Sequence, residues 1–231
     1  MAENRFAVIG MGRFGTAIAQ TLSQRGAEVL AIDNREENIE DIKDEVAYAV
    51  TMDSTDIKAL KSQNIQDMDA IVVAIGGDFE ALLLTTVLLM ELNVKRVIAR
   101  ATGKHQRMIL EKLGIKEILS PEHEVGIAVA ERLLNPNIIT SLQLPDSYEI
   151  VEVKTPKELA NRTIAEISLR NKYNLNLITL KREFEVNKDG TPEVEKHILG
   201  VPSSDTILFE TDTIIVFGKA RDIERFIEIN K

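Results

Sequence analysis

The order of apolar and polar positions predicts alternating strands and helices through the first half of the chain. Short continuous apolar runs are typical of parallel strands buried on both faces, and helical periodicity fills the stretches between them. The predicted strands are 6–9, 28–32, 46–51, 70–75, 97–100 and 118–119. The predicted helices are 16–24, 55–61, 78–92, 104–113 and 122–134. This alternation predicts an α/β fold with a doubly wound parallel sheet over residues 1–134.

The pattern changes after Leu134, where Asn135-Pro136-Asn137 ends the last of these helices. Residues 135–147 are expected to form a linker with a short helix at 138–142. The strands predicted next are 150–153, 175–180 and 213–217, and a closing helix is predicted at 222–229. Residues 148–231 therefore read as a small α+β domain. A unit of this size buries a limited core, so docking or dimerisation is expected.

A glycine motif follows the first predicted strand and opens the first helix. Gly10, Gly12 and Gly15 are spaced as G-x-G-x-x-G, the dinucleotide-binding fingerprint of the Rossmann-like fold. Gly10 permits the tight turn, Gly12 lets a pyrophosphate approach the backbone, and Gly15 lets helix and strand pack closely. The unpaired N–H groups of the first helical turn then face anionic oxygens. The pattern predicts a nucleotide site, and the alternative is a tight strand–helix turn without a ligand.

An acid at the end of the second predicted strand supports the nucleotide reading. Asp33 lies 23 residues after Gly10, close to the roughly 20 expected for the acid that binds ribose hydroxyls. A carboxylate there repels a 2′-phosphate and so disfavours NADP. Arg35 lies nearby, however, and an arginine can accommodate such a phosphate. Arg13 is a cation in the opening turn of a helix, where the macrodipole is positive. It indicates further phosphates nearby, or a side chain that swings into solvent.

Composition excludes several classes of function. The chain has 231 residues, 44% of them hydrophobic and 28% charged, and its formal net charge of -9 argues against non-specific nucleic-acid binding. The absence of cysteine excludes disulfides, thiolate catalysis and cysteine-ligated metals, and fits a reducing cytoplasm. The chain enters a strand almost at once, so no signal peptide is expected. Its longest apolar stretch, 81–90, is too short to cross a bilayer, so we expect any membrane role to come through a partner.

The chain resembles the RCK (or KTN) family over nearly its whole length. The resemblance rests on Gly-Arg-Phe-Gly in the glycine loop, on Ile32-Asp33, on the 72–76 and 99–101 stretches, and on residues 212–218 near the end. Members of this family are cytosolic regulatory subunits of Ktr/Trk-type potassium uptake systems, or gating domains of potassium channels. The resemblance implies a nucleotide-binding N-terminal domain followed by a C-terminal RCK domain.

The same resemblance implies a regulatory function. Such proteins are not enzymes, and their dimers assemble into octameric rings beneath a membrane potassium transporter subunit. The expected location is cytoplasmic, peripheral on the inner face of the cell membrane, without insertion into it. The ligand is ATP or ADP in the Ktr type and NAD or NADH in the Trk type, and its exchange changes the ring. Gly-Arg-Phe-Gly and the single copy of the module favour ATP/ADP, while the choice between the two ligand pairs stays open.

Individual positions acquire roles from the resemblance. Arg13 is expected to reach the terminal phosphate of ATP, often from a neighbouring subunit, and Asp33 to hold ribose. Asp53 and Ser54 match positions beside the adenine, where Met52 replaces a smaller residue of many relatives. The full set of expected cofactor-binding residues is Gly10, Met11, Gly12, Arg13, Phe14, Gly15, Asp33, Asn34, Asp53, Ser54, Ala74, Ile75, Gly76 and Arg100.

Two further ligands are implied by matching positions. Glu122 stands where an acidic residue of the family binds a divalent cation, although a glutamate in the first turn of a helix is also favourable by itself. Cyclic di-AMP binds the C-terminal domain of some relatives, and Ser168 replaces an acid common in them. The matching positions are Ile164, Ile167, Arg170, Asn176 and Pro202, which could equally be core, helix-surface and turn residues.

Two other functions remain open at this point. A nicotinamide-dependent oxidoreductase needs a general acid or base near the hydride site. The candidates are His105 on a polar helix, His123 between two glutamates and His197 in a polar loop, and solvent exposure explains each of them. These histidines are not spaced as a metal cluster. A bare NAD sensor acting on a partner unrelated to potassium is the other alternative.

Overall fold

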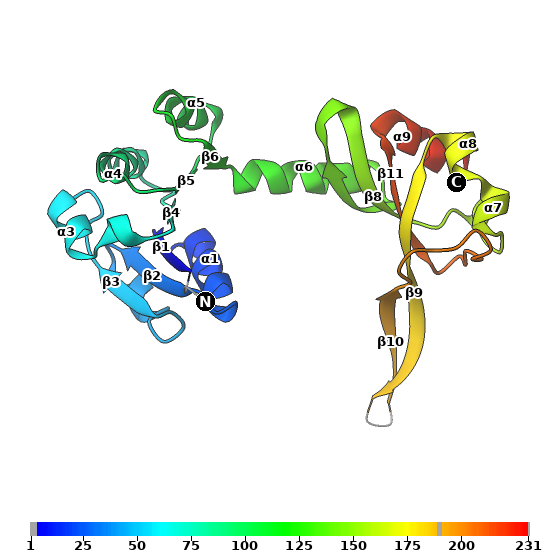
Figure 1. The fold of residues 1–231 in the computed structure, drawn as a ribbon, viewed down its shortest axis with the longest axis horizontal. Helices are drawn as coiled ribbons and strands as arrows, with labels where there is room; N and C mark the ends of the chain where they lie inside the picture. The colour runs from blue at the N-terminus through cyan, green and yellow to red at the C-terminus, as the bar shows by residue number, and fades with distance from the viewer. Residues whose placement is uncertain (1–3, 189–190, 231) are drawn as a thin grey trace. The chain divides into compact units, whose positions relative to one another are not determined.

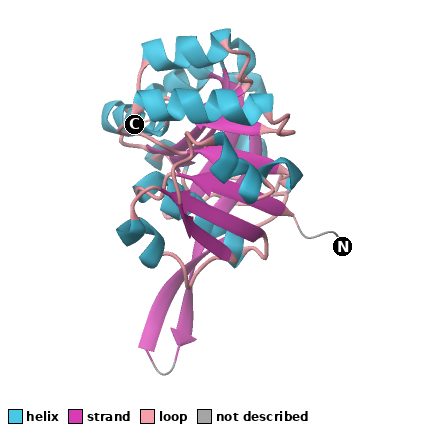
Figure 2. Ribbon diagram, turned by 90° about the vertical axis from the view of Figure 1, so that its left-hand side faces the viewer, coloured by secondary structure: helices cyan, strands magenta, loops and turns pink. Residues whose placement is uncertain are grey.

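Two units divide the chain in the computed structural model, which describes residues 4–188 and 191–230 (Figure 1). The first unit ends at Glu124 and the second begins at Val125, within one helix. The first unit alternates strands and helices, whereas the second is rich in antiparallel strands, two of which form the long hairpin that stands clear of the other elements of that unit in Figure 2. The domain boundaries expected from the sequence, at 134 and 148, stay a prediction.

The first unit is built on a parallel sheet. Its strands are β1 (Arg5–Ile9), β2 (Glu28–Asp33), β3 (Tyr48–Thr51), β4 (Ala70–Val73), β5 (Val97–Arg100) and β6 (Glu117–Leu119). Its helices are α1 (Arg13–Gln24), α2 (Glu36–Glu40), α3 (Ile57–Ser62), η1 (Ile65–Asp67), α4 (Phe79–Glu91), α5 (Lys104–Lys112) and the start of α6 (Pro121–Leu134). The strand order β3-β2-β1-β4-β5-β6 reverses direction at β1. This is the doubly wound order, and it confirms the predicted Rossmann-like fold.

Alternate residues of the central strands enter two separate cores. Ala7 and Ile9 pack with α3, α4 and α5, whereas Val8 packs with α1 and α2 on the opposite face. All three side chains are buried, which explains why these strands read as continuous apolar runs rather than as alternating ones. Because β1 lies at the reversal point, the loops after β1 and β4 leave the sheet side by side and open a crevice.

The second unit is built on an antiparallel sheet in the order β10-β9-β11-β8-β7. The strands are β7 (Ile138–Gln143), β8 (Tyr148–Lys154), β9 (Asn176–Lys188), β10 (Thr191–Ile198) and β11 (Thr213–Lys219). The helical segments are η2 (Pro145–Ser147), η3 (Lys157–Leu159), α7 (Ile164–Ile167), α8 (Leu169–Tyr173) and α9 (Ala220–Ile229). Side chains of α7, α8 and α9 share one core with β8, β9 and β11. This confirms the predicted small α+β unit.

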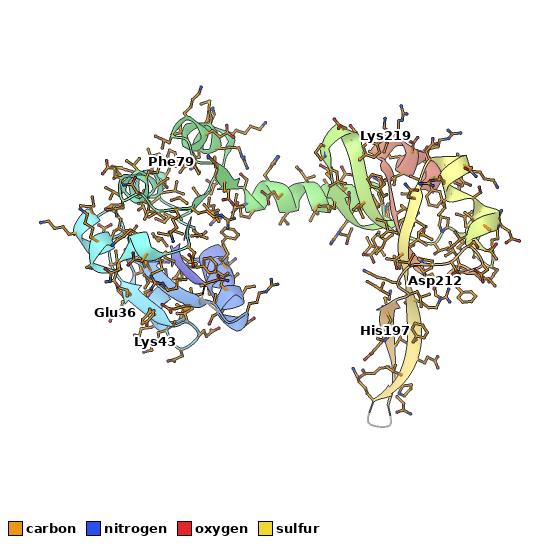
Figure 3. The ribbon with its side chains drawn as sticks, viewed as in Figure 1. Glu36, Lys43, Phe79, His197, Asp212 and Lys219 are labelled. Atoms are coloured by element: carbon orange, nitrogen blue, oxygen red, sulfur yellow. The ribbon has the colours of Figure 1, made fainter. Side chains whose placement is uncertain are left out.

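Three local expectations are wrong. Residues 138–143 form strand β7 rather than a short helix, because they pair with β8 through Leu142 opposite Ile150. His197 lies on strand β10 rather than in a loop, as Figure 3 shows. The helix expected at 55–61 begins only at Ile57, because Asp56 is its N-cap and accepts a hydrogen bond from the backbone of Lys58 at 2.8 Å.

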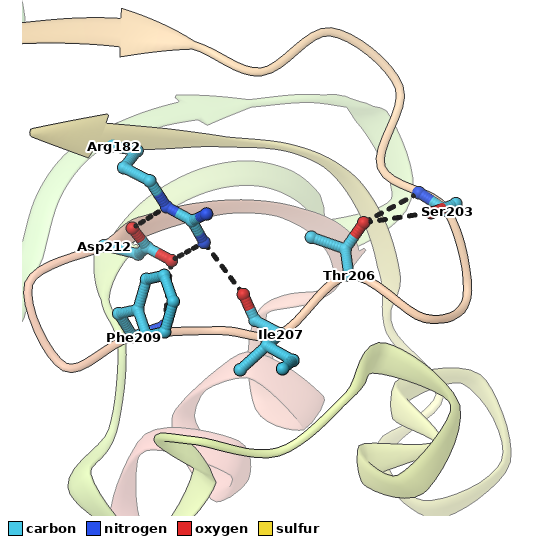
Figure 4. A network of polar contacts seen from close by, with 6 residues as sticks. All are labelled: Arg182, Ser203, Thr206, Ile207, Phe209 and Asp212. Carbon is cyan, nitrogen blue, oxygen red and sulfur yellow. Dashed lines mark hydrogen bonds and ion pairs between the residues drawn. The ribbon is translucent and has the colours of Figure 1, made fainter. Parts of the chain in front are cut away.

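A buried ion pair ties the base of the β9–β10 hairpin to the loop before β11 (Figure 4). Arg182 donates from Nε and Nη2 to the two carboxylate oxygens of Asp212 at 2.9 and 2.7 Å, and also to the carbonyl of Ile207 at 2.8 Å. The Asp212 side chain is fully buried and accepts a further bond from the backbone of Phe209. The carboxylate of Asp212 raises the pKa of Arg182 above its usual value. The guanidinium carbon also lies 4.2 Å from the centre of the Phe209 ring.

Within the described residues, no helix is both long and apolar enough to cross a membrane.

Candidate nucleotide site

The three loop glycines meet different steric demands. Gly10 has φ +98° and its backbone N–H donates to Ile32 at 2.7 Å, a conformation that disfavours any side chain. A Cβ on Gly15 would lie 1.9 Å from the carbonyl oxygen of Gly10, so the loop and α1 touch only because Gly15 has none. Gly12 is the N-cap of α1, and no atom lies within 4 Å of where its Cβ would be. The space at Gly12 is therefore open for a ligand.

Asp33 ties the glycine loop to the turn after β2. Its side chain is almost fully buried, and its Oδ2 accepts a hydrogen bond from the backbone N–H of Met11 at 2.6 Å. Its Oδ1 accepts one from the backbone N–H of Arg35 at 2.9 Å. Each carboxylate oxygen keeps a further lone pair that could accept a hydroxyl. Asp33 is thus a structural tether whether or not a ligand is bound.

A cavity of about 440 Å³ lies beside this loop, where β1 to β5 end. Its volume is within the range of small-molecule sites. The cavity is lined by Gly10, Gly12, Asp33, Asn34, Arg35, Asn38, Met52, Asp53, Ser54, Ala74, Ile75, Gly76, Gly77, Asp78, Ala81 and Arg100. The structure therefore brings together most of the cofactor residues expected from the sequence, drawn from five strands that are separate along the chain.

Four of the expected residues do not line the cavity. Met11 is buried beneath the loop, and Gly15 is buried where α1 contacts it. Phe14 is half-buried, with its ring centre 5.4 Å from the guanidinium carbon of Arg100. Arg13 is exposed at the start of α1. The cavity wall is therefore supported by three residues that do not line it, Met11, Phe14 and Gly15. The exposed side chain of Arg13 can reach a ligand or a neighbouring molecule.

The two residues expected beside adenine are engaged differently. Asp53 Oδ1 accepts from the hydroxyl and the backbone N–H of Thr55, at 2.7 and 2.8 Å, and these bonds lower the pKa of Asp53. The buried Ser54 hydroxyl lies 2.8 Å from that of Thr85 on α4. The Ser54 hydroxyl thus already has a protein partner, and Ser54 shapes the cavity wall.

Arg100 connects the cavity to the first turn of α6. Its Nη2 donates to Oε1 of Glu122, whose pKa is lowered first by a hydrogen bond from its own backbone N–H and then by Arg100. The described residues contain no group of three or more histidine or acidic side chains placed to hold a metal. Divalent-cation binding at Glu122 therefore stays a prediction.

Two polar atoms at this cavity are buried without a hydrogen-bond partner among the described residues. They are Nδ2 of Asn38 and Nε of Arg100. An unsatisfied buried donor costs roughly 1–3 kcal/mol, and both atoms lie beneath the cavity surface, so a ligand would reach them only after the side chains shift. The side chain of Arg100, the open backbone at Gly12 and the carboxylate of Asp33 together fit an adenosine nucleotide, which carries phosphate acceptors and ribose hydroxyls.

Several lining residues were not expected from the sequence. Asn38 lies on the short helix α2, which the apolar pattern did not predict, and its Oδ1 accepts from Arg35 Nη2 at 3.1 Å. Asp78 caps α4 by accepting from the backbone of Ala81 at 3.0 Å. Gly77 precedes that cap in the loop that follows β4. The Gly-Gly-Asp sequence after a buried strand could have revealed the last two, because it marks a strand end followed by a helix start.

The positions matched to cyclic di-AMP lie in the second unit. Arg170 Nε donates to Oδ1 of Asn176 at 3.1 Å, so these two are neighbours. Ile167 is fully buried in the core and Ile164 packs against that core, which agrees with the alternative reading of both as core residues. Pro202 is half-buried in the loop after β10. Cyclic di-AMP binding stays a prediction.

No histidine is among the described residues that line the nucleotide cavity. His105 lies on α5 and His123 on α6, whereas His197 packs beside the ring of Phe184 on the hairpin. A general acid or base at the mouth of this cavity would have to come from a carboxylate instead.

Comparisons with known proteins match both units. The TrkA-N domain family model matches residues 6–121, and the TrkA-C domain family model matches residues 148–231. The Ktr system potassium uptake proteins C and A of Bacillus subtilis are each 32% identical to this chain over 224 residues, 97% of this chain and 96% of each relative. Among solved structures, the NAD(P)-binding domain of an exopolyphosphatase-related protein from Archaeoglobus fulgidus is similar with a TM-score of 0.50 and 26% identity. That similarity covers 56% of this chain and 96% of that domain.

Proposed function

The chain belongs to the family of TrkA-N and TrkA-C (RCK) domain proteins, and from that premise we propose that it is a nucleotide-binding regulatory subunit of a Ktr-type potassium uptake system. Membership confirms the resemblance inferred from the glycine loop and the C-terminal stretch. The chain is a regulatory protein and not an oxidoreductase, because its near-full-length relatives are potassium uptake proteins.

The proposed switch is the exchange of ATP for ADP in the cavity beside the glycine loop. One observation carries it: Asp33, the open backbone at Gly12 and the side chain of Arg100 line one space of about 440 Å³. Asp33 would accept the ribose hydroxyls, and the α1 N-terminus would face the phosphates. The exposed side chain of Arg13 would reach the γ-phosphate of ATP, either in its own cavity or in that of a neighbouring copy. ADP lacks that phosphate, so the two nucleotides would favour different states by their differential affinity.

The proposed partners follow from the same family. Copies of the chain would form dimers and an octameric ring, and the ring would act on a membrane potassium transporter subunit from the cytoplasmic side. One copy of the TrkA-N/TrkA-C pair per chain supports this arrangement, since a ring must then come from repeated chains. The membrane subunit, rather than this chain, would determine ion selectivity.

The test compares the arginines at the two ends of α1, where Arg13 is the first residue and Arg25 the C-cap. We expect Arg13→Ala to weaken ATP binding more than ADP binding in calorimetry of the assembled protein, because only ATP offers the γ-phosphate. The matched control is Arg25→Ala, which removes an exposed cation at the other end of α1 and should leave both affinities unchanged. Equal losses of ATP and ADP affinity in Arg13→Ala would contradict the proposed role.

A second candidate is NAD/NADH sensing at the same cavity. The G-x-G-x-x-G loop with Asp33 favours it, as does the similarity of 56% of this chain to a domain described as NAD(P)-binding. A calorimetric panel of ATP, ADP, NAD and NADH on the purified protein separates the two candidates. Tighter binding of NAD or NADH than of ATP would replace the ATP/ADP proposal.

A further inference from the structure

The guanidinium of Arg100 is fixed on the wall of the nucleotide cavity. Arg100 is the last residue of β5, and its side chain is only 17% exposed. A Cβ on Gly76 would lie 2.6 Å from Nη1 of Arg100, so the guanidinium rests directly on the Gly76 backbone. Phe14 adds an aromatic ring to the same position, 5.4 Å from the guanidinium carbon. The charge of Arg100 is therefore held at one place that a ligand in the cavity would meet.

The hydrogen-bonding capacity of this guanidinium is only partly used. Nη2 donates to Glu122, whereas Nε is buried and has no partner among the described residues. Arginine carries five N–H donors in a planar fork that matches phosphate oxygens. A phosphate group in the cavity would accept from the accessible N–H groups of this fork and draw it away from the carboxylate.

The ion pair between Arg100 and Glu122 contributes little free energy, because Glu122 is exposed. Its side chain is 57% exposed and lies on the first turn of α6, next to Arg100 but outside the set of residues that line the cavity. An exposed ion pair contributes roughly 0–1 kcal/mol, because water and salt screen the attraction. A carboxylate in the first turn of a helix is also favourable without any partner. Breaking the Arg100–Glu122 pair therefore costs little compared with a charge-assisted bond to phosphate.

We propose that Glu122 competes with the ligand's phosphates for Arg100, so that the charge of the bound ligand determines whether the Arg100–Glu122 ion pair forms. With the cavity empty, Arg100 is neutralised by Glu122. An anionic ligand takes over Arg100 and frees the first turn of α6, the helix that carries the chain from the first unit into the second. A ligand without phosphate leaves the pair intact. This inference rests on the proposed nucleotide function, and it assigns the response to ligand charge to the Arg100–Glu122 ion pair.

The test measures ADP and adenosine binding by calorimetry on the full chain, with a chelator present to remove divalent cations. We expect Glu122→Gln to bind ADP about 2- to 5-fold more tightly, because the competing carboxylate is gone. Adenosine affinity should not change. The matched control is Glu124→Gln, which removes an equal charge from the same helical turn, where Glu124 contacts the backbone of Ser120 instead of Arg100. That control should leave ADP affinity unchanged.

A double-mutant cycle separates competition from a simple change of net charge. Arg100→Gln should weaken ADP binding, and adding Glu122→Gln in that background should have no further effect. Three results would overturn the inference: weaker or unchanged ADP binding in Glu122→Gln, an equal gain for adenosine, or a gain that persists without Arg100. Wild-type protein that binds neither ADP nor ATP would instead refute the proposed nucleotide function. If the wild-type protein binds ADP and Glu122→Gln binds it with the same affinity, only the proposed competition is refuted.

Discussion

Asp33 is expected to stabilise the first unit even when no nucleotide is present. Its two carboxylate oxygens accept backbone N–H groups from Met11 and Arg35, at 2.6 and 2.9 Å, in a nearly dry position. Hydrogen bonds to a charged acceptor contribute about 1.5–3 kcal/mol each. Asp33→Asn keeps the shape and one acceptor oxygen, but turns an NH₂ group toward one of the two N–H donors. We therefore expect it to lower the free energy of unfolding by roughly 1–3 kcal/mol.

The assay is urea unfolding of the ligand-free protein followed by circular dichroism. The control is Asp44→Asn, which removes a charge from an exposed aspartate in the same unit and should change stability by less than about 0.5 kcal/mol. Equal stability of the two variants would refute the view that Asp33 tethers the glycine loop. Calorimetry of the same proteins then tests the ribose role separately. Destabilisation with unchanged ADP affinity would keep the tether and remove Asp33 from the ligand.

Three further predictions concern other parts of the chain. Arg182→Met should cost about 3–5 kcal/mol in unfolding experiments, because it strands the buried carboxylate of Asp212. The double variant with Asp212→Leu should recover much of that loss, and no recovery would contradict the ion-pair explanation. Gly15→Ala should destabilise the protein and abolish nucleotide binding, since its Cβ would overlap a loop carbonyl. Gly12→Ala, which meets no atom, should retain stability and lose nucleotide affinity alone. Because Asp53 has a lowered pKa when folded, its contribution to stability is full at neutral pH and is lost as the pH falls below about 4. Asp53→Asn should reduce the acid-side slope in unfolding curves recorded against pH, and an unchanged slope would refute the assignment.

The sequence predicted the first unit well for a physical reason. Its central strands β1, β2 and β4 are buried on both faces, so their apolar runs are continuous, and most of the helices between strands have their own periodicity. The glycine loop was equally clear, because Gly10 and Gly15 meet steric demands that no other residue meets. The position of Asp33 at the end of β2 followed from the register of strand and motif.

The second unit was harder to predict because its strands depend on pairing partners distant in sequence. Strand β7 carries exposed Leu142 and Gln143 and forms only because β8 lies beside it. Strand β10 alternates charged and apolar residues such as Glu193 and Val194, with neither face clearly apolar, and it pairs with the extended end of β9. Local patterns carry little signal for such strands, since what stabilises them is the cross-strand contact.

The site was predicted in outline and missed in detail. Residues at strand ends and in the glycine motif were expected, because strand ends converge on one edge of a parallel sheet. Asn38 was missed because α2 is only five residues long and has no amphipathic period. The Arg100–Glu122 contact was missed because nothing in the sequence indicates that a strand end and the start of α6 touch.

Helix α6 has fourteen residues, and none of its side chains is buried within the single chain. Val125, Leu133 and Leu134 are 61%, 76% and 75% exposed. A helix of this length is marginal in water without packing, so its persistence would depend on how many molecules are present to cover it. Melting temperature should then rise with protein concentration, as it does whenever folding and association share one equilibrium. Melting temperatures measured over a dilution series would show how much of the folded structure depends on association between copies of the chain.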